Sequence, residues 1–595
     1  MNSIKNMLST LRLVWGICKS RVLHEGTITV VDYIEWLFFS SFFIRYILLA
    51  IEKNKDFNEI ILFIAATAVF FCLCSVYKNY VVNVTRPLTD TYIYKKLYGT
   101  LYKKSLNVEL RCFENDEFYN KYTMAVDEAD KRVNLIVKNF FTIVFGGIAT
   151  VVAFVIMYTI DSFAMLFLIS PLIGNFVFGT ILNKLVFKRY EEMIPDVRKI
   201  EYINRIVHLS DYAKEMRLTK IFNLLKQKYT RAISSIVRIT DGYSKKAVVV
   251  YWLHTMLTFT IFQGVFIYGA YRTMISKTMP LSELAVLVSV TVTTTWILIG
   301  VTTAIMQNIN SSLYMENLFS FLKYKEEIPE DYEGIIPKNE VESVEFRNVS
   351  FGYGKEKRMI QNLSFKVVGG TKSAFVGHNG AGKSTIIKLL LRMYDPSDGE
   401  ILVNGIDIRE YNLSAYRQLF AAALQDGKIF SMSIKDNVLM GKVVNREEEI
   451  VQEALENSGI SVKVSGLSNG MDTVLTKEFD ENGAVFSGGQ FQKIAVARVF
   501  AHAAPVSLFD EPSSALDPIA ECELYDSIIE YSTNKTMFLI SHRLSSVRNV
   551  DMIFMLEQGE LIESGSHEDL MSRGGAYAQM YVKQAESYVT DEMVV

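Results

Sequence analysis

The clearest chemistry in the chain lies in the run Gly-His-Asn-Gly-Ala-Gly-Lys-Ser at 377–384. A strand-like segment, 373–376, comes before it, and a helical pattern, 385–393, follows it. Glycines at such a turn let backbone N–H groups surround phosphate oxygens, while Lys383 can reach the β and γ phosphates and Ser384 can hold Mg²⁺. The alternative, a glycine-rich turn with an accidental lysine, does not account for the flanking strand and helix. The run therefore predicts a P-loop that binds a nucleotide.

Further polar groups follow strand-like runs later in the chain. Asp510 and Glu511 close one such run, and His542 comes just after another. Hydrolysis of a triphosphate needs a water in line with the γ phosphate, a base that orients this water, and positive charge on the transferring group. We expect Glu511 to be the base, Lys383 with Mg²⁺ to supply the charge, and His542 to hold the γ-phosphate geometry. The alternatives are a surface carboxylate for Glu511 and a core histidine for His542.

Four other motifs complete an ordered set. They are Val-Ser-Phe-Gly-Tyr ending at Tyr353, Ala-Leu-Gln-Asp around Gln425, Phe-Ser-Gly-Gly-Gln from Phe486 to Gln490, and Ser-Ala-Leu-Asp ending at Asp517. Each motif is weak alone, but with the P-loop, the Asp-Glu pair and the histidine the set resembles the ATP-binding cassette (ABC) family over nearly all of 341–585. Phe486 departs from the leucine usual there, which exchanges one apolar anchor for another.

The resemblance implies a role for each matching residue. The ring of Tyr353 stacks on adenine, Gln425 contacts Mg²⁺ and senses the membrane domain, and the signature segment Ser487–Gln490 caps the ATP of a partner cassette. Asp517 lies in the loop that crosses the dimer seam. The implied cofactors are ATP and Mg²⁺, and the implied Mg²⁺ ligands are Ser384, Gln425 and Asp510. The implied ATP contacts are Tyr353, Gly377, Asn379, Gly380, Ala381, Gly382, Lys383, Ser384, Thr385, Gln425, Ser487, Gly488, Gly489, Gln490 and Asp517.

In this family each nucleotide site is split between two cassettes, with the P-loop of one facing the signature segment of the other. The chain has one of each, so the resemblance implies a dimer. Heterodimers often carry one degraded site, whereas Glu511 and the Ser487–Gln490 segment are intact here. A second copy of this chain is therefore the expected partner, and a paired half-transporter is the alternative.

Composition points to a membrane protein. Half of the 595 residues are hydrophobic, more than a water-exposed surface of this size would carry. The net charge is −3, which gives no bias toward nucleic acid as a partner. The five cysteines show no metal-ligand or redox spacing and imply no disulfide framework.

Apolar runs of about 20 residues, enough to cross a bilayer, occur six times before residue 310. The long connections 83–134 and 187–246 are rich in Lys and Arg, whereas the three short loops carry few. Basic residues mark the cytoplasmic side, so both termini and the cassette are expected in the cytoplasm. A bacterial plasma (inner) membrane is the expected location. The expected spans are 28–51, 59–82, 135–158, 162–186, 247–271 and 281–306.

The expected fold is a polytopic α-helical membrane domain, with six transmembrane helices and long cytoplasmic extensions, fused to an α/β P-loop ATPase domain. A short amphipathic helix along the membrane face is expected before the first span. The expected domain ranges are 1–27 for this helix, 28–320 for the transmembrane domain, 321–340 for a charged linker, 341–585 for the cassette and 586–595 for a tail.

The two long connections resemble the cytoplasmic extensions of exporters in this family, whose tips dock on the cassettes. The segment Glu109–Phe118 resembles the first docking region and Asp211–Leu218 the second. On charge pattern alone the second segment could equally be an ordinary charged helix. Closure of two ATP-bound cassettes, passed through such segments, would convert a cavity facing the cytoplasm into one facing outward.

The sequence says less about the transported cargo. Thr291, Thr295 and Thr302 share one face of the sixth span, and such hydroxyls either bond back to the helix or line a cavity for an amphipathic compound. About 27 residues precede the first span, too few for a leader-cleaving peptidase domain. We expect ATP-driven export of a peptide or other amphipathic compound. A lipid flippase or multidrug exporter is the alternative, and an ATP-gated channel or regulator is the alternative from a different class.

Overall fold

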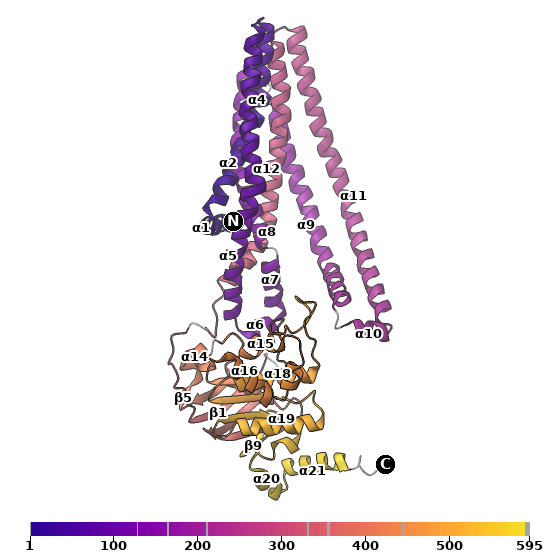
Figure 1. The fold of residues 1–595 in the computed structure, drawn as a ribbon. Coiled ribbons are helices and arrows are strands. Elements are labelled where there is room, and N and C mark those ends of the chain that lie inside the picture. The colour runs from indigo at the N-terminus through magenta and orange to yellow at the C-terminus, as the bar shows by residue number, and fades with distance from the viewer. Residues whose placement is uncertain are drawn as a thin grey trace. The chain divides into compact units, whose positions relative to one another are not determined.

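The computed structural model describes residues 2–127, 129–163, 166–209, 212–329, 332–353, 358–442 and 445–589. The chain forms two compact units. The first comprises residues 1–104 and 120–324 and is helical, and the second comprises residues 105–119 and 325–595 and mixes strands with helices (Figure 1). Each is described below by itself.

Long helices make up the first unit, and π-helical turns interrupt or end three of them. The helices are α1 (Asn2–Ile17), α2 (Lys19–Leu37), α3 (Ile44–Glu52), α4 (Phe57–Tyr80), α5 (Arg86–Asn107), α7 (Asp116–Asp127), α8 (Ala129–Ile160), α9 (Leu166–His208), α10 (Ala213–Leu218), α11 (Ile221–Ala270) and α12 (Leu281–Leu322). The π-helical turns are η1 (Phe38–Phe43), η2 (Val81–Thr85) and η5 (Tyr271–Ile275). Within this unit α8 packs along α12, and α9 packs along α11 (Figure 1).

Five helical stretches in the described part of the chain are long and apolar enough to cross a membrane. They are Lys19–Glu52, Phe57–Asn107, Ala129–Ile160, Ile221–Ile275 and Leu281–Leu322. Each contains one of the expected spans. The remaining span, 162–186, includes residues 164 and 165, which lie outside the described residues; the rest of it falls mostly in α9, and this span stays a prediction.

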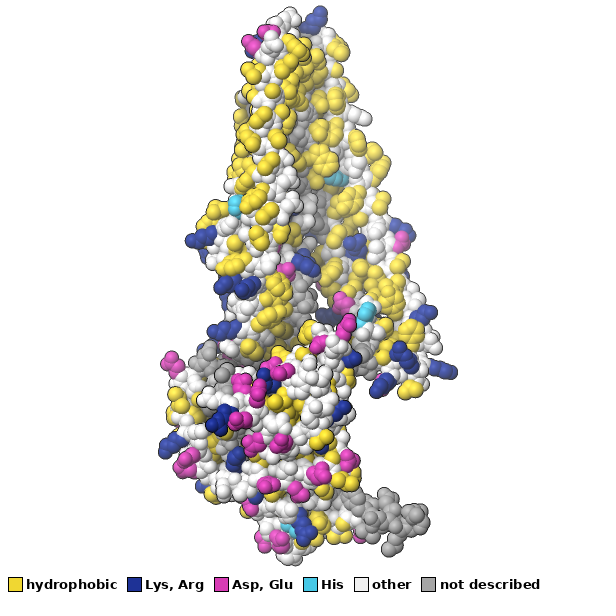
Figure 2. All heavy atoms as spheres, in the orientation of Figure 1, with side chains coloured by type: hydrophobic (Ala, Val, Ile, Leu, Met, Phe, Trp, Pro, Cys, Tyr) yellow, Lys and Arg dark blue, Asp and Glu magenta, His cyan; other side chains and the backbone are white. Residues whose placement is uncertain are grey.

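Apolar side chains lie on the outside of the first unit, the reverse of a water-soluble bundle. No residue of α4 is buried, although this helix is almost entirely apolar between Ile60 and Val76. Figure 2 shows hydrophobic side chains over much of the visible face of the long helices. Such a surface is stable only in a hydrocarbon solvent, as expected for a membrane domain.

The N-terminal segment differs from the single amphipathic helix expected over 1–27. Helix α1 ends at Ile17, and Cys18 has an extended backbone with φ −147° and ψ 90°. Helix α2 begins at Lys19 and continues without a break into the first apolar stretch. Residues 19–27 therefore belong to the helix that continues into the first apolar stretch, and only α1 stands apart from it.

The second unit is built on two sheets. A six-stranded sheet has the order β10-β9-β3-β8-β7-β6, with all neighbours parallel except β10 and β9. Its strands are β3 (Lys372–Gly377), β6 (Phe420–Ala423), β7 (Val506–Asp510), β8 (Thr536–Ile540), β9 (Met552–Glu557) and β10 (Glu560–Gly565). An antiparallel sheet of order β2-β1-β4-β5 contains β1 (Ser343–Phe351), β2 (Ile360–Val368), β4 (Asp398–Val403) and β5 (Ile406–Asp407).

Helices connect and cover these strands. They are α13 (Lys383–Leu390), α14 (Leu413–Arg417), α15 (Ile434–Leu439), α16 (Glu447–Asn457), α17 (Ser461–Ser465), α18 (Gly488–Ala501), α19 (Pro518–Tyr531), α20 (His567–Arg573) and α21 (Ala576–Val589), with short 3₁₀ turns at 408–410, 470–472 and 544–547. Alternate residues of β3 enter opposite cores: Ala374 and Val376 pack with one cluster of buried side chains, and Phe375 with the other. A parallel strand buried on both faces is thereby held on both, which fixes where its carboxyl end lies.

The first expected docking segment belongs to the cassette unit rather than to the helical unit. Residues 105–119 cluster with the cassette, and they contain the short helix α6 (Leu110–Glu114). The buried carboxylate of Glu109 accepts hydrogen bonds from the backbone N–H groups of Glu327 and, at 3.1 Å, of Ile328. Arg111 pairs with the Glu327 carboxylate at 2.6 Å. Of the second expected segment, Asp211 lies outside the described residues, and the rest enters α10, which packs on α11.

Candidate functional site

The P-loop connects the end of β3 to the start of α13, and glycines allow its path. Gly377 has φ +144°, and a Cβ there would lie 2.1 Å from the carbonyl oxygen of Leu556. Gly382 has φ +98°, and a Cβ there would lie 2.5 Å from Cδ1 of Ile360. Gly382 directly precedes α13 and makes no side-chain cap. The first N–H groups of α13 are therefore left for a ligand, which is the arrangement that binds phosphate.

Lys383 folds back over this loop. Its side chain is buried, and its Nζ donates hydrogen bonds to the carbonyl oxygens of Gly377 at 2.8 Å and His378 at 3.0 Å. Burial lowers the pKa of the Lys383 ammonium, while the nearby carboxylates of Glu511 and Asp510 oppose this shift. An anion in the groove would favour the charged form, so the loop is built to receive negative charge.

Two carboxylates at the end of β7 face the P-loop. Ser384 Oγ donates to Asp510 Oδ1 at 3.1 Å. Burial raises the pKa of Asp510 to about 6; the Ser384 hydrogen bond lowers it and the Glu511 charge raises it. Glu511 itself has φ +51°, a conformation that costs about 1–3 kcal/mol in a non-glycine residue and is found mostly at functional sites.

Glu511 is held from two sides. Gln425 Nε2, just after β6, donates to Glu511 Oε2 at 3.0 Å, and His542 Nε2, just after β8, contacts Glu511 Oε1. Strands β6, β7 and β8 are adjacent and parallel in the sheet, so their carboxyl ends bring these three side chains together. The sheet order decides this meeting, because 86 residues separate Gln425 from Glu511.

These residues line an open groove of about 380 Å³. The described residues that line it are Met359, Asn379, Gly380, Gly382, Lys383, Ser384, Thr385, Gln425, Glu511 and His542. Ala381 is buried beneath the loop, and Gly377 forms its start. Met359 was not expected from the sequence. It directly precedes β2, and its neighbour Ile360 packs against Gly382 of the P-loop. This contact joins distant segments, so no local sequence pattern predicts it.

Tyr353 lies beside the groove. Its hydroxyl is 3.2 Å from Oγ1 of Thr385, and the Nζ of Lys388 lies 5.4 Å from the centre of its ring. The ring meets Phe351 and Tyr394 edge to face, with centroid distances of 5.1 and 5.3 Å. These neighbours hold the ring upright while 40% of the residue stays exposed, so a flat ligand can stack on it.

The signature segment and Asp517 are not part of this groove as far as the described lining shows. Ser487 caps α18: its hydroxyl accepts from the Gln490 N–H at 3.4 Å, and the Gln490 side chain accepts from the Ser487 N–H at 2.9 Å. Gly488 and Gly489 form the first turn of α18. Asp517 caps α19 through the N–H groups of Ile519 and Ala520, and the Ala520 hydrogen bond is the main cause of its lowered pKa.

One contact joins these two remote segments. The Gln492 side chain, on α18, accepts a hydrogen bond from the Ala515 N–H at 2.9 Å and donates to the Ser514 hydroxyl. Gln492 was not expected from the sequence, although it lies only two residues after the signature segment. The contact fixes the loop at 514–517 against the start of α18, so both segments form one rigid surface of the cassette.

Comparison with known proteins places this geometry among relatives. A profile described as ABC transporter matches residues 360–514. The subtilin transport ATP-binding protein SpaT of Bacillus subtilis is 32% identical over 501 residues, which cover 83% of this chain and 80% of that protein. The ATP-dependent lipid A-core flippase of Escherichia coli (strain K12) is 37% identical over 242 residues, which cover 40% of this chain and 41% of the flippase.

A solved structure has the same fold over nearly the whole length. It is a bacterial Atm1-family ABC exporter with ATP bound, and it matches with a TM-score of 0.70. The match covers 96% of this chain and 99% of that chain at 22% sequence identity.

Proposed function

The chain belongs to the ABC transporter family, as an ATPase coupled to export across a membrane, and from this premise we propose that two copies export a peptide. The family resemblance seen in the sequence is confirmed, as is the fold of a helical membrane domain fused to an α/β ATPase domain. ATP binding follows from the family. The dimer, the cargo, Mg²⁺ and the roles of single residues are our proposal.

One observation carries the assignment of roles: Lys383, Ser384, Gln425, Glu511 and His542 come from four separate loops into one groove. Lys383 would hold the β and γ phosphates, and the N–H groups of α13 would surround them. Glu511, with its position set by Gln425 and His542, would orient the attacking water. Positioning and electrostatic stabilisation of this kind account for most of the catalysis of phosphoryl transfer.

Mg²⁺ fits the side chains beside Ser384. The Ser384 hydroxyl, the Asp510 carboxylate and the amide oxygen of Gln425 would supply oxygen ligands, which suits Mg²⁺ bound together with a nucleotide. When bound, Mg²⁺ would neutralise charge on the β and γ phosphates. The protein then has only to keep Asp510 ionised and Ser384 oriented.

The separation of the signature segment from the groove supports the dimer. Ser487, Gly488 and Gly489 lie on a capped helix that does not line the groove of the same chain, and Asp517 is fixed beside them. A second copy would place its signature segment over this groove and complete it. Both copies carry Glu511 and an intact signature, so both composite sites would be active.

Similarity favours a peptide over a lipid as cargo. The match to SpaT covers 83% of this chain, which includes much of the membrane part, and the name of SpaT assigns it to subtilin transport. The lipid A-core flippase matches only 242 residues. Because cargo contacts lie in the membrane part, the longer match is the more informative one. We further propose that both termini and the cassette lie in the cytoplasm of a bacterium, with export across its inner membrane.

The test uses the full-length chain reconstituted in sealed vesicles with the cassettes outside. ATP hydrolysis and ATP-dependent accumulation are measured against peptides, lipids and hydrophobic cations. We expect hydrolysis and uphill uptake of a peptide, and a loss of both in Glu511→Gln, about 10²–10⁴-fold in rate. Glu523→Gln, at an exposed position of α19, is the matched control and should behave as the wild type.

Three results would change the proposal. Stimulation by lipids alone would replace the peptide by a lipid. Dissipation of a gradient without uphill uptake would indicate a channel. No hydrolysis by the wild type under any condition would remove the homodimer and direct the search to a partner chain.

A further inference from the structure

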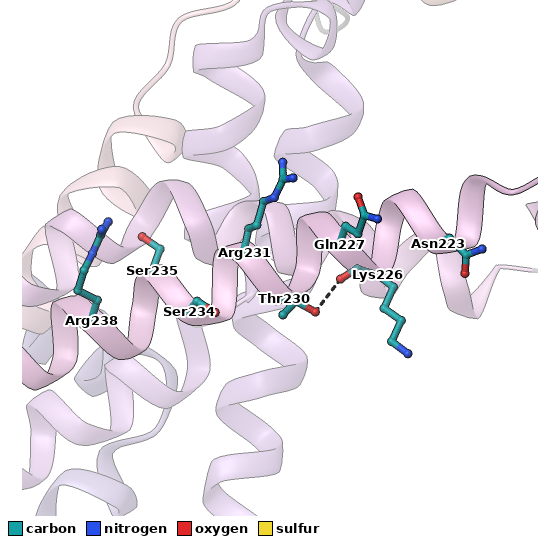
Figure 3. A pocket seen from close by; sticks show the side chains of 8 residues that line it. All are labelled: Asn223, Lys226, Gln227, Thr230, Arg231, Ser234, Ser235 and Arg238. Carbon is teal, nitrogen blue, oxygen red and sulfur yellow. Dashed lines mark hydrogen bonds between the residues drawn. The ribbon is translucent and has the colours of Figure 1, made fainter.

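Two gatherings of polar side chains outside the nucleotide groove differ in kind. On α11, eight polar side chains lie along one helix, with no second element among the described lining (Figure 3). In the cassette, side chains from two helices, α19 and α21, converge on the short segment 541–544, which carries His542. Only the second arrangement fixes one point of the chain from several sides.

Helix α21 is tied to the cassette before it reaches this segment. The carboxylate of Glu563, in β10, accepts hydrogen bonds from the backbone N–H groups of Ala576 at 2.8 Å and Tyr577 at 3.0 Å. Tyr577 is fully buried in the core, and Tyr581, one turn further along, packs against the same core. Because residues three or four apart share a face of a helix, the next position on this face is Gln584.

The amide of Gln584 bonds to the backbone beside His542. Its Nε2 donates to the His542 carbonyl oxygen at 2.8 Å, and its Oε1 accepts from the Leu544 N–H at 2.9 Å. Arg543, between them, has an extended backbone with φ −99° and ψ 115°, which turns these two groups to the same side. A glutamine amide carries one donor group and one acceptor, so it satisfies both at once, as a neighbouring strand would.

Helix α19 holds the alternate residues of the same segment. The buried Tyr525 hydroxyl donates to Ser541 Oγ at 3.2 Å, and Arg543 pairs with the buried carboxylate of Glu521. Residues 541 and 543 are therefore held from α19, whereas the backbone groups of 542 and 544 are held from α21. The segment keeps its anchors on α19 when Gln584 is replaced, but the peptide group that follows His542 loses its side-chain partner.

The place of the His542 ring depends on this peptide group. At one end the ring contacts Glu511 Oε1 through Nε2, and at the other it is attached to the backbone at 542. A rotation of the peptide group would therefore move the ring relative to Glu511. Reactions that depend on positioning are sensitive to such shifts, and a displacement of about 1 Å can cost about 100-fold in rate.

We propose that Gln584 is a positioning residue for ATP hydrolysis: it fixes the backbone of His542, so that α21 controls turnover in a groove whose described lining includes no residue of α21. The inference rests on the role proposed for His542. Gln584 contacts neither the P-loop nor Glu511 in the described structure, so it acts on the catalytic step and not on the binding of ATP. Displacement of α21 thereby slows hydrolysis while the nucleotide site stays filled.

The test compares ATP hydrolysis by full-length variants reconstituted in lipid vesicles. Gln584→Ala removes both hydrogen bonds to the segment, and we expect a kcat about tenfold lower with a KM for ATP within about twofold of the wild type. Gln584→Glu keeps the size and the acceptor for the Leu544 N–H but loses the donor to His542, so it should also lower kcat.

The matched control lies on the same helix. Gln579 is an exposed glutamine of α21, and the described part of the chain shows no hydrogen bond to its side chain. Gln579→Ala should keep the kcat and KM of the wild type. This control separates the contact with His542 from the general effect of placing alanine in α21.

A double-mutant cycle separates positioning from a general loss of stability. His542→Ala alone should lower kcat about 100-fold, as expected when one group that stabilises a charged transition state is lost. Adding Gln584→Ala should then cause no further fall, because no ring remains to be positioned. A merely structural role of Gln584 would lower kcat by the same factor in both backgrounds.

The inference is overturned if His542→Ala is impaired while Gln584→Ala has the kcat of the wild type. It is also overturned if Gln584→Ala raises KM and leaves kcat unchanged, or if its effect on kcat is the same with and without His542. A wild-type rate in His542→Ala itself would overturn the role proposed for His542, and the inference with it. The two failures are therefore distinguished by the single variants.

Discussion

Helices α13 and α18 of the cassette both begin at glycine-rich segments, yet their first turns are in opposite states. Gly382 precedes α13 with a left-handed backbone and no side-chain cap, so the first N–H groups remain open. Ser487 and Gln490 close α18 with a reciprocal capping box. The comparison shows that the open start of α13 borders a groove within one chain, whereas the start of α18 is capped by its own side chains and lines no such groove in the described part of the chain. This difference is the structural reason for expecting a dimer.

The largest expected effect comes from a substitution at the uncapped start of α13. Lys383→Met should weaken ATP binding about 100-fold, because the ammonium would make charge-assisted hydrogen bonds to phosphate that are worth about 1.5–3 kcal/mol each. Binding is measured by fluorescence of a nucleotide analogue on the full-length protein. Lys493→Met, on α18, is the control and should leave the affinity of one cassette unchanged. Equal losses of ATP affinity in both variants would show that the starts of α13 and α18 do not differ in nucleotide binding.

Close packing behind the capped end gives the next effect. A Cβ at Gly489 would lie 2.7 Å from the Ala515 carbonyl oxygen, whereas a Cβ at Gly488 meets only Ala515 Cβ at 3.6 Å. Gly489→Ala should lower the free energy of unfolding by about 2 kcal/mol, because overpacking forces the backbone to move. Gly488→Ala should be neutral or slightly stabilising. Urea unfolding of the two variants measures this, and equal stabilities would contradict the fixed contact between α18 and the loop at 514–517.

Low pH should weaken nucleotide binding at the start of α13, beside Asp510, and should not affect the capped start of α18. The pKa of Asp510 is about 6, so its carboxylate is lost as pH falls through 6, and Mg²⁺-dependent ATP binding should weaken about tenfold near pH 5. Asp510→Asn should bind Mg²⁺-ATP weakly at every pH and remove the dependence. Titration of affinity between pH 5 and 8 tests this. A wild-type profile that is flat over this range would contradict the assignment.

The same shift has a signed effect on stability. The folded-state pKa of Asp510 lies above its unfolded value, so the folded cassette binds more protons between about pH 4 and 6. Stability without ligand should therefore fall as pH rises through that window, by about 3 kcal/mol from this group, and stay level above it. Asp510→Asn should flatten the curve.

The smallest expected effect concerns the cap itself. Ser487→Ala removes the side-chain acceptor for the Gln490 N–H and should lower stability by about 1 kcal/mol. ATP affinity of the P-loop should be unchanged, while hydrolysis by the dimer should fall. Thermal unfolding and hydrolysis rates are compared with Ser527→Ala, a half-buried serine within α19 whose hydroxyl donates to the Glu523 carbonyl and caps no helix. If Ser487→Ala instead lowered ATP affinity and left the hydrolysis rate unchanged, the proposed difference between α13 and α18 would be wrong.

The sequence predicted much of the groove because its motifs are local. A P-loop is a strand, a glycine-rich turn and a helix within about twenty residues, so the chemistry of Lys383 and Ser384 can be inferred without a fold. Glu511 and His542 were predicted from their places at strand ends. Met359 and Gln492 could not be predicted, because their contacts with the groove and with the loop at 514–517 depend on packing between distant segments.

The membrane part shows the same division. Apolar runs predicted five of the observed helical stretches, since a span must be long and apolar whatever its neighbours are. The course of α1 into α2 and the grouping of residues 105–119 with the cassette were not predicted. Both depend on which surfaces meet, and hydrogen bonds such as those of Glu109 with the backbone at 327 and 328 leave no periodic pattern.

By itself the sequence determined the class of the protein and the order of its two parts, and it predicted a set of nucleotide-binding residues. These follow from local spacing, hydropathy and the distribution of Lys and Arg. Only the tertiary structure decided that Gln425 and His542 meet Glu511, and that the signature segment lies apart from the described lining of the groove. The physical reason is that strand order and helix packing bring together residues far apart in the chain, and neither is encoded in any short stretch of it.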